Sequence, residues 1–319
     1  MTAKSAAGVW RSCKSMGSSV RRLITVTSCK GGVGKSTVSL ELAYRLAVRG
    51  HRVGLFDADV HGPSLPSQLP HVLSARRVEL TKDGLSVLPI DFDNLKMMSF
   101  GWLCQSWNRP GAEIRVRAAL APLLLQTTRW GELDWLVIDS PPGTGDIPIA
   151  LATKLPLHGA VVVTTPSKLS AADVVRGIQM LKRLKVPILA IVENMASFRC
   201  TTCENDHFPF GRGHMDEILS SIRDDGTDLT PTFSLPILAD VGFRAAATSH
   251  GSPKPSSSLS GTLDSLVESL ENSTAGSVGI SFPHRLRAHE LPHWPTEMSM
   301  AELSMDAQRN FDSFSIPAR

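Results

Sequence analysis

The sequence predicts a doubly wound α/β fold, in which a mostly parallel sheet is flanked by helices. Two features of the chain carry this prediction. Runs of apolar, β-branched residues alternate with helical patterns, as an open parallel sheet requires. Three of these runs are almost continuously apolar, which is typical of strands buried on both faces. Ligands are therefore expected at the carboxyl ends of the strands.

The expected elements follow in chain order. The strands are expected over residues 23–28, 52–58, 85–90, 95–100, 134–140, 159–165 and 186–194. The first two helices are expected over residues 35–49 and 112–128. In the helical pattern SAADVVRGIQMLKRL, one face carries the apolar residues Val174, Ile178 and Leu181. A last helix, over 262–273, is indicated by the spacing of Leu263, Leu266, Val267 and Leu270.

Composition limits the classes of protein that the chain can represent. Of its 319 residues, 42% are hydrophobic and 20% are charged, and the net charge is only +3. No apolar run approaches the roughly 18 residues of a membrane span, so neither stable membrane insertion nor a general nucleic-acid interface is expected. The five cysteines are odd in number and scattered, which argues against a disulfide framework and for a reducing compartment.

The stretch TSCKGGVGKST, Thr27 to Thr37, indicates a phosphate-binding loop between the first strand and the first helix. Glycines let the backbone pass close to phosphate, and the helix N-terminus points its amides at the anion. Lys35 is expected to reach the β and γ phosphates of ATP. The predicted nucleotide contacts are Cys29, Lys30, Gly31, Gly32, Val33, Gly34, Lys35, Ser36 and Thr37.

Cys29 stands where the usual loop pattern begins with glycine. It lies at the exit of the strand, before the tight part of the loop, so phosphate binding should tolerate it. A small apolar side chain tucked beside the loop is the preferred interpretation, and a redox or cluster role is the alternative.

Carboxylates follow two of the predicted strands at the same edge of the sheet. Asp139 ends the buried run DWLVID, where it is expected to bind Mg²⁺ together with Ser36. Asp57 and Asp59 end the second strand and are candidates for positioning the attacking water. One of the two is the better catalytic candidate, but the sequence does not choose between them, and a solvated turn is the alternative. The catalytic candidates are Lys30, Lys35, Asp57, Asp59 and Asp139.

Five stretches together carry a family resemblance: CKGGVGKST, GLFDADVHGPSLP, DWLVIDSPPGTGD, VVVTTP and VENM. In order and spacing, residues 22–250 resemble the Mrp/ApbC family of deviant P-loop ATPases, relatives of MinD and of the nitrogenase iron protein. The resemblance implies slow ATP hydrolysis and a homodimer in which Lys30 reaches the nucleotide of the partner. It also implies that Asn194 contacts adenine, and that the protein carries iron-sulfur clusters.

The stretch FRCTTCENDHFPFG supplies Cys200 and Cys203 as candidate ligands. Thiolates suit an iron-sulfur cluster or Zn²⁺, and the two-residue spacing lets one metal centre take both. Two ligands complete neither site, so a redox dithiol, or half of a zinc site with His207, are alternatives. With the resemblance, two cysteine pairs meeting in a dimer would bind a labile [4Fe–4S] cluster.

The expected organisation is one nucleotide-binding domain with extensions. Residues 1–21 read as a basic leader or transit peptide, 22–250 as the P-loop domain with its CxxC loop, and 251–261 as a Pro/Ser linker. The docking helix over 262–273 and a loosely ordered tail over 274–319 complete the chain. The leader favours an organelle, and the short segment before the P-loop resembles the NUBPL-like or plastid high-chlorophyll-fluorescence-type members. The mitochondrion is preferred over the plastid, with the cytosol as the alternative.

The leading functional hypothesis is an ATP-dependent carrier or scaffold that transfers a [4Fe–4S] cluster to apo-proteins. Its cofactors would be ATP and Mg²⁺, and its partners a second copy, apo iron-sulfur clients and upstream cluster-assembly factors. The first alternative is a MinD/ParA-like positioning ATPase that uses nucleotide-dependent dimerisation. The second is a small-molecule kinase or synthetase on the same fold.

Overall fold

The computed structural model of the chain describes residues 18–69, 78–79, 86–92, 94–106, 121–122, 124–200, 202–212, 215–222, 230–237, 260–274 and 280–282. None of the helices formed by these residues combines the length and apolarity that a membrane crossing demands.

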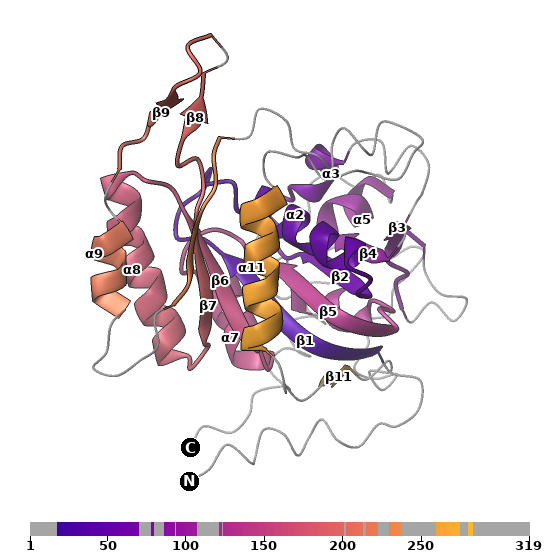
Figure 1. The fold of residues 1–319 in the computed structure, drawn as a ribbon. Helices are drawn as coiled ribbons and strands as arrows, with labels where there is room; N and C mark the ends of the chain where they lie inside the picture. The colour runs from indigo at the N-terminus through magenta and orange to yellow at the C-terminus, as the bar shows by residue number, and fades with distance from the viewer. Residues whose placement is uncertain are drawn as a thin grey trace.

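A nine-stranded, mostly parallel sheet forms the centre of the molecule and confirms the predicted fold class (Figure 1). Its spatial order is β10-β7-β6-β1-β5-β2-β4-β3, and β11 pairs with β1 outside this path. Only β3 and β11 run antiparallel to their neighbours. The strands are β1 (Ser18–Thr27), β2 (Val53–Asp57), β3 (Ile90–Phe92), β4 (Leu95–Ser99), β5 (Glu132–Asp139), β6 (Gly159–Thr164), β7 (Ile188–Glu193), β10 (Thr232–Ser234) and β11 (Ile280–Phe282).

Helices cover both faces of the sheet. In β6 and β7, alternate residues pack into two different cores, because successive side chains of a strand point to opposite faces. One face carries α8 (Lys168–Arg183) and α9 (Met215–Ile222), and the other carries α11 (Ser260–Ser273), which packs beside α2 (Lys35–Val48). The remaining described helices are α3 (Leu65–Gln68), α5 (Phe100–Ser106) and α7 (Asp146–Lys154). A separate two-stranded hairpin, β8 (Phe198–Arg199) and β9 (Asp206–His207), follows β7.

The predicted apolar faces of two helices are buried. In α8, the side chains of Val174, Ile178 and Leu181 lie in the core. In α11 (Ser260–Ser273), all four residues whose spacing predicted a helix over 262–273 are buried. The acidic side of α11 forms ion pairs with basic side chains at and just after the end of α2. These pairs are Arg45–Asp264 at 3.0 Å, Arg49–Glu268 at 3.2 Å, Arg49–Glu271 at 3.0 Å and His51–Glu271 at 2.6 Å.

The structure differs from the predicted organisation at both ends of the domain. The predicted leader boundary at residue 21 falls inside β1, which begins at Ser18. The segment predicted as a loose tail contributes β11, whose Ile280 pairs with Val20 at the start of β1. Both differences involve one backbone pairing, because β11 pairs with the first residues of β1. Residues 1–17 and 283–319 lie outside the described residues.

The structure also differs from the predicted elements at two places within the domain. The strand expected over 85–90 is displaced, because Val87 forms only a single bridge to Thr128 and the regular strand is β3. Of the helix expected over 112–128, residues 121–122 and 124–127 are helical, and 107–120 lie outside the described part of the chain. The linker expected over 251–261 lies outside it up to residue 259.

The docking of α11 gives a stability prediction. Leu266→Ala removes a fully buried side chain between α11 and the sheet. We expect the free energy of unfolding to fall by about 2–5 kcal/mol, because a cavity is left behind. Urea unfolding measures this loss, and Ser265→Ala, an exposed change on the same helix, serves as the control. Equal stability of the two variants would show that α11 does not contribute to the core.

Candidate functional site

The parallel strands bring the predicted site residues to one edge of the sheet. β1, β2, β5, β6 and β7 all end at this carboxyl edge, and the glycine-rich loop follows β1. In the register of the sheet, Asp57 and Asp139 lie directly opposite each other. The two carboxylates therefore share one side of the sheet, on neighbouring strands.

A cavity of about 210 Å³ lies above this edge. Every residue that was predicted to contact the nucleotide from the loop lines it, with the exception of Cys29. Lys30 is exposed at its rim, and Asp59 and Pro142 come from neighbouring loops. The full lining is Ser28, Lys30, Gly31, Gly32, Val33, Gly34, Lys35, Ser36, Thr37, Asp59 and Pro142.

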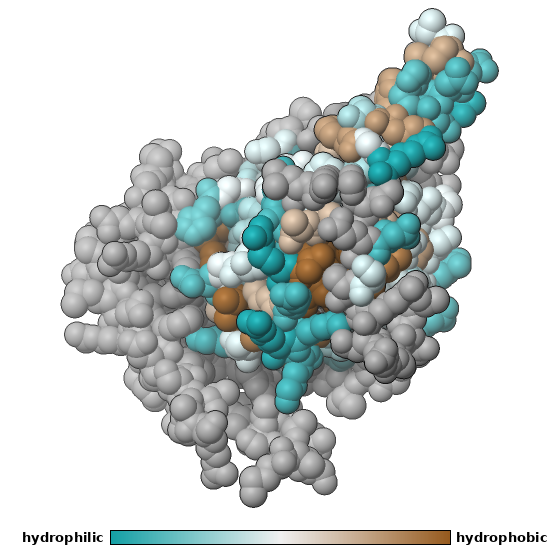
Figure 2. All heavy atoms as spheres, turned by 90° about the vertical axis from the view of Figure 1, so that its left-hand side faces the viewer, coloured by the Kyte–Doolittle hydropathy of each residue, from teal (hydrophilic) through white to brown (hydrophobic). Residues whose placement is uncertain are grey.

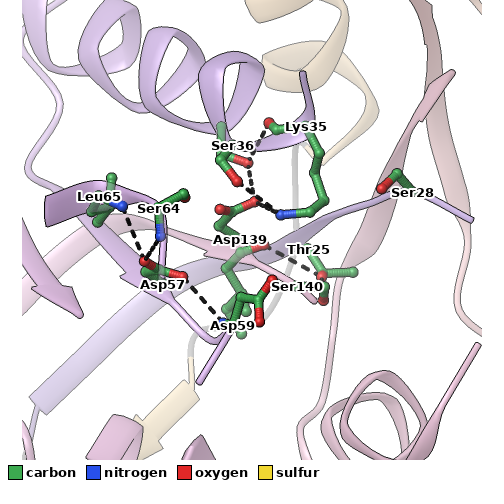
Figure 3. A network of polar contacts seen from close by, with 12 residues as sticks. Thr25, Ser28, Lys35, Ser36, Asp57, Asp59, Ser64, Leu65, Asp139 and Ser140 are labelled. Carbon is green, nitrogen blue, oxygen red and sulfur yellow. Dashed lines mark hydrogen bonds and ion pairs between the residues drawn. The ribbon is translucent and has the colours of Figure 1, made fainter. Parts of the chain in front are cut away.

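Lys35 is held below the loop by Asp139 (Figure 3). Its ammonium donates to Asp139 Oδ1 at 2.5 Å and to Ser36 Oγ at 3.0 Å, and both partners of the ion pair are buried. Ser39 Oγ donates to the same carboxylate oxygen at 2.9 Å. Asp139 Oδ2 is buried and has no hydrogen-bond partner among the described residues. An orphaned carboxylate oxygen close to a serine hydroxyl is a donor set that fits Mg²⁺, which prefers oxygen ligands.

The structure distinguishes Asp57 from Asp59, between which the sequence did not choose as catalytic candidates. Asp57 is fully buried, and its carboxylate accepts bonds from Asp59 N at 3.1 Å, Ser64 N at 3.0 Å, Leu65 N at 3.2 Å and Ser99 Oγ at 3.0 Å (Figure 3). These bonds fix the loop after β2 and turn Asp57 away from the cavity, so the expected catalytic role does not fit its position. Asp59 lines the cavity instead, and its Oδ1 accepts from the amides of His61 and Gly62.

Burial and the neighbouring Asp139 raise the pKa of Asp57 to about 7. Removal from water is the larger cause, since it penalises the charged carboxylate. The hydrogen bonds to Asp57 act in the opposite direction but do not compensate for burial.

Asn194 braces the loop from the end of β7. Its side-chain amide donates to the carbonyl of Val33 at 2.9 Å, while its Oδ1 is buried and has no partner in the part of the chain that the structure describes. Gly34 makes this contact possible, because a Cβ at that position would lie 2.2 Å from Asn194 Nδ2. Gly34 also has a φ of +81°, which side chains disfavour. The structure therefore gives Asn194 a bracing contact, and the adenine contact expected from the family resemblance stays a proposal.

Cys29 faces away from the nucleotide loop. Its thiol packs against α8 at Gly177, where a Cβ would lie 2.0 Å from the sulfur. Burial raises the pKa of the thiol to about 11, so it is neutral at physiological pH. The side chain of Cys29 fills a gap beneath the loop and does not line the cavity, and its contact with the nucleotide stays a prediction. The interpretation as a small apolar side chain fits this position, and the need for glycine at position 177 was missed.

The β8–β9 hairpin brings Cys200, Cys203 and His207 together. Their ligand atoms all lie within 4.8 Å of one another, and Cys203 Sγ is 3.3 Å from His207 Nε2. The backbone amides of Cys203 and Thr202 donate to the Cys200 sulfur and lower its pKa. The hairpin extends beyond the body of the molecule, with hydrophobic and hydrophilic side chains side by side (Figure 2).

A second cavity of about 400 Å³, which the sequence did not indicate, lies where the hairpin joins the body. It is lined by Glu193, Ala196, Ser197, Phe208, Gly211, Arg212 and Ser234. The guanidinium of Arg212 stacks on the ring of Phe208.

Comparison with known proteins places these features in a family. Residues 19–247 match the family described as "ParA: NUBPL iron-transfer P-loop NTPase". The chloroplastic Fe-S cluster assembly factor HCF101 of Arabidopsis thaliana is 42% identical over 234 residues, which cover 73% of this chain and 41% of that protein. The iron-sulfur cluster carrier protein of Haemophilus influenzae is 44% identical over 200 residues, which cover 61% and 52% respectively. The chain thus spans about half, or less, of the length of these relatives.

Solved structures show the same fold. A nucleotide-binding protein from Archaeoglobus fulgidus in complex with ADP is 35% identical, with a TM-score of 0.57 over 69% of this chain and 83% of that one. The septum site-determining protein MinD of Pyrococcus horikoshii, complexed with Mg-ADP, is 22% identical. Its TM-score is 0.51 over 80% of this chain and 97% of that one, a likeness of fold alone.

Gly34 can be tested without any ligand. Gly34→Ala places a side chain at positive φ, which lowers the free energy of unfolding by about 1–2 kcal/mol. The new side chain also displaces the Asn194 amide from the loop. We expect a lower melting temperature in the absence of nucleotide. Gly31→Ala is the matched control, because its Cβ meets nothing within 4 Å. Identical melting curves for both variants would refute the bracing role of Asn194.

Asp57 gives the stability of the protein a pH dependence. The folded carboxyl holds its proton up to about pH 7, whereas the ordinary pKa is 3.8. Protonated Asp57 therefore makes its full contribution to the free energy of unfolding below pH 4, and this contribution is lost as the pH rises toward 7.

Asp57→Asn removes this titration. From pH 5 to 7.5 we expect the unfolding free energy of the wild type to decline relative to that of the variant, by at most about 1.4 kcal/mol per pH unit. Urea unfolding across this range measures the difference. Parallel pH profiles of the two proteins would contradict the raised pKa.

Proposed function

Because this chain belongs to the family of NUBPL-type iron-transfer P-loop NTPases, we propose that it is an ATP-dependent carrier of iron-sulfur clusters. One observation carries the proposal. A P-loop cavity and a pair of cysteines, Cys200 half-buried and Cys203 exposed, stand at the same edge of one sheet. The names of the plant and bacterial relatives support the same activity.

The P-loop residues would bind and hydrolyse ATP. Successive loop amides cradle the phosphates, and Lys35 moves from Asp139 to the phosphate charge when the nucleotide enters. Ser36 and Asp139 would hold Mg²⁺, which neutralises phosphate charge when bound. Asp59, in the cavity wall, positions the attacking water. Lys30 is exposed at the rim and would reach the nucleotide of a second copy.

The cluster is the cargo of this protein rather than a resident cofactor. Cys200 and Cys203 of two copies supply the four thiolates that a [4Fe–4S] cluster requires. The exposed position of the hairpin supports transfer, because a client apo-protein can approach the ligands directly. Upstream assembly factors would load the same hairpin.

A MinD/ParA-like positioning function has less support. Such a protein would need a free amphipathic surface for a membrane or partner. The apolar face of α11 is buried, and its acidic side pairs with α2.

An organelle is the proposed location. The leader composition and the chloroplastic relative support it. The expected preference for a mitochondrion over a plastid gains no support from these relatives, and the bacterial relatives carry no compartment in their names.

Anaerobic reconstitution with iron and sulfide tests the proposed function. We expect about four iron and four sulfide ions per dimer of the wild type, and none in the Cys200→Ala/Cys203→Ala double variant. Cys29→Ala is the matched control, because this buried cysteine lies outside the hairpin and should leave cluster loading intact. Equal iron in the wild type and the double variant would remove the cluster role.

A further inference from the structure

We propose that Cys200, Cys203 and His207 of a single chain form a three-ligand site for one thiophilic divalent cation of the Zn²⁺ class. The inference rests on the proposed function in that the same two cysteines serve both, but it needs neither a cluster nor a second copy. It adds His207 as a ligand and leaves one coordination position open.

The distances between the ligand atoms are close to those of a tetrahedral site. Zinc binds sulfur at about 2.3 Å and imidazole nitrogen at about 2.0 Å, so its ligand atoms lie about 3.5–3.8 Å apart. Cys203 Sγ and His207 Nε2 are 3.3 Å apart, and all three ligand atoms lie within 4.8 Å. Small side-chain rotations therefore complete the three-ligand arrangement.

The hairpin backbone holds these ligands in place before any metal arrives. His207 pairs with Phe198 across the hairpin, and Cys200 lies two residues after Phe198, on the same face. The turn is closed by Cys200 N bonding to Asn205 O at 3.0 Å and by Glu204 N bonding to Cys200 O at 2.9 Å. Glu204, directly after Cys203, has a φ of 55°, a conformation that such a residue adopts at a cost.

A neighbouring acidic side chain has an ion pair of its own. Asp206 is next to His207 in sequence but pairs with Arg199 at 3.6 Å. Among the described residues, Cys200, Cys203 and His207 are the one group of three or more potential ligands whose donor atoms converge. A tetrahedral ion therefore keeps a fourth position for water or for an incoming thiolate.

This arrangement lets a single chain hold a metal ion that a second thiolate pair can later take over. When two copies approach, the thiolates of the second copy can replace the imidazole. Occupation of the site by Zn²⁺ should therefore compete with cluster assembly on the same cysteines.

Cobalt titration of the full-length apo-protein under anaerobic conditions tests the site, because Co²⁺ occupies Zn²⁺ sites and its thiolate complexes absorb light. We expect one Co²⁺ per chain, with a thiolate-to-cobalt charge-transfer band that added Zn²⁺ abolishes. His207→Ala should weaken Co²⁺ binding by about tenfold or more. His207→Cys should restore the affinity and strengthen the band. His61→Ala, an exposed histidine outside the hairpin, is the control.

The outcomes separate this inference from the proposed function. Unchanged Co²⁺ affinity in His207→Ala, or one Co²⁺ for every two chains, would overturn the three-ligand site even if the wild type loads a [4Fe–4S] cluster. One Co²⁺ per chain that depends on His207 would support the site even if no cluster assembles.

Discussion

The buried ion pair between Lys35 and Asp139 is the interaction on which the carboxyl edge depends. Asp139 ends a strand buried on both faces, and a lone carboxylate there would be costly to remove from water. Lys35 compensates that charge at 2.5 Å and thereby ties the first turn of α2 to the neighbouring strand. The loop between β1 and α2 is thus shaped before a nucleotide enters. A phosphate that draws Lys35 away leaves the carboxylate to a metal ion, so nucleotide and Mg²⁺ should bind together.

The end of β7 lies between the glycine-rich loop and the β8–β9 hairpin. Asn194 bonds to the carbonyl of Val33 in the loop, and the chain reaches Cys200 only six residues later. One short segment therefore contacts the loop at its start and leads into the hairpin at its end. We propose two uses for this one hairpin: the open three-ligand site on a single chain, and the cluster shared by two copies.

The sequence was sufficient to predict the elements that depend on residues close together in the chain. Continuous apolar runs predicted the inner strands, and the spacing of Leu263, Leu266, Val267 and Leu270 predicted α11. It failed where a feature depends on a distant partner. The pairing of β11 with the start of β1 joins residues more than 250 positions apart, and neither segment has an apolar pattern of its own. The choice between Asp57 and Asp59 depends on which carboxylate the folded loop buries and which it leaves in the cavity wall. The orientation of Cys29 depends on the glycine in α8. Such contacts leave no signal in local composition.

The central claim is that two copies of this chain share one cluster through their hairpins. Native mass spectrometry of the reconstituted protein under anaerobic conditions measures this stoichiometry in a single step. The account predicts a species with the mass of two chains plus one Fe₄S₄ unit. A cluster retained on single chains, or a dimer that carries no iron and sulfide, would contradict it.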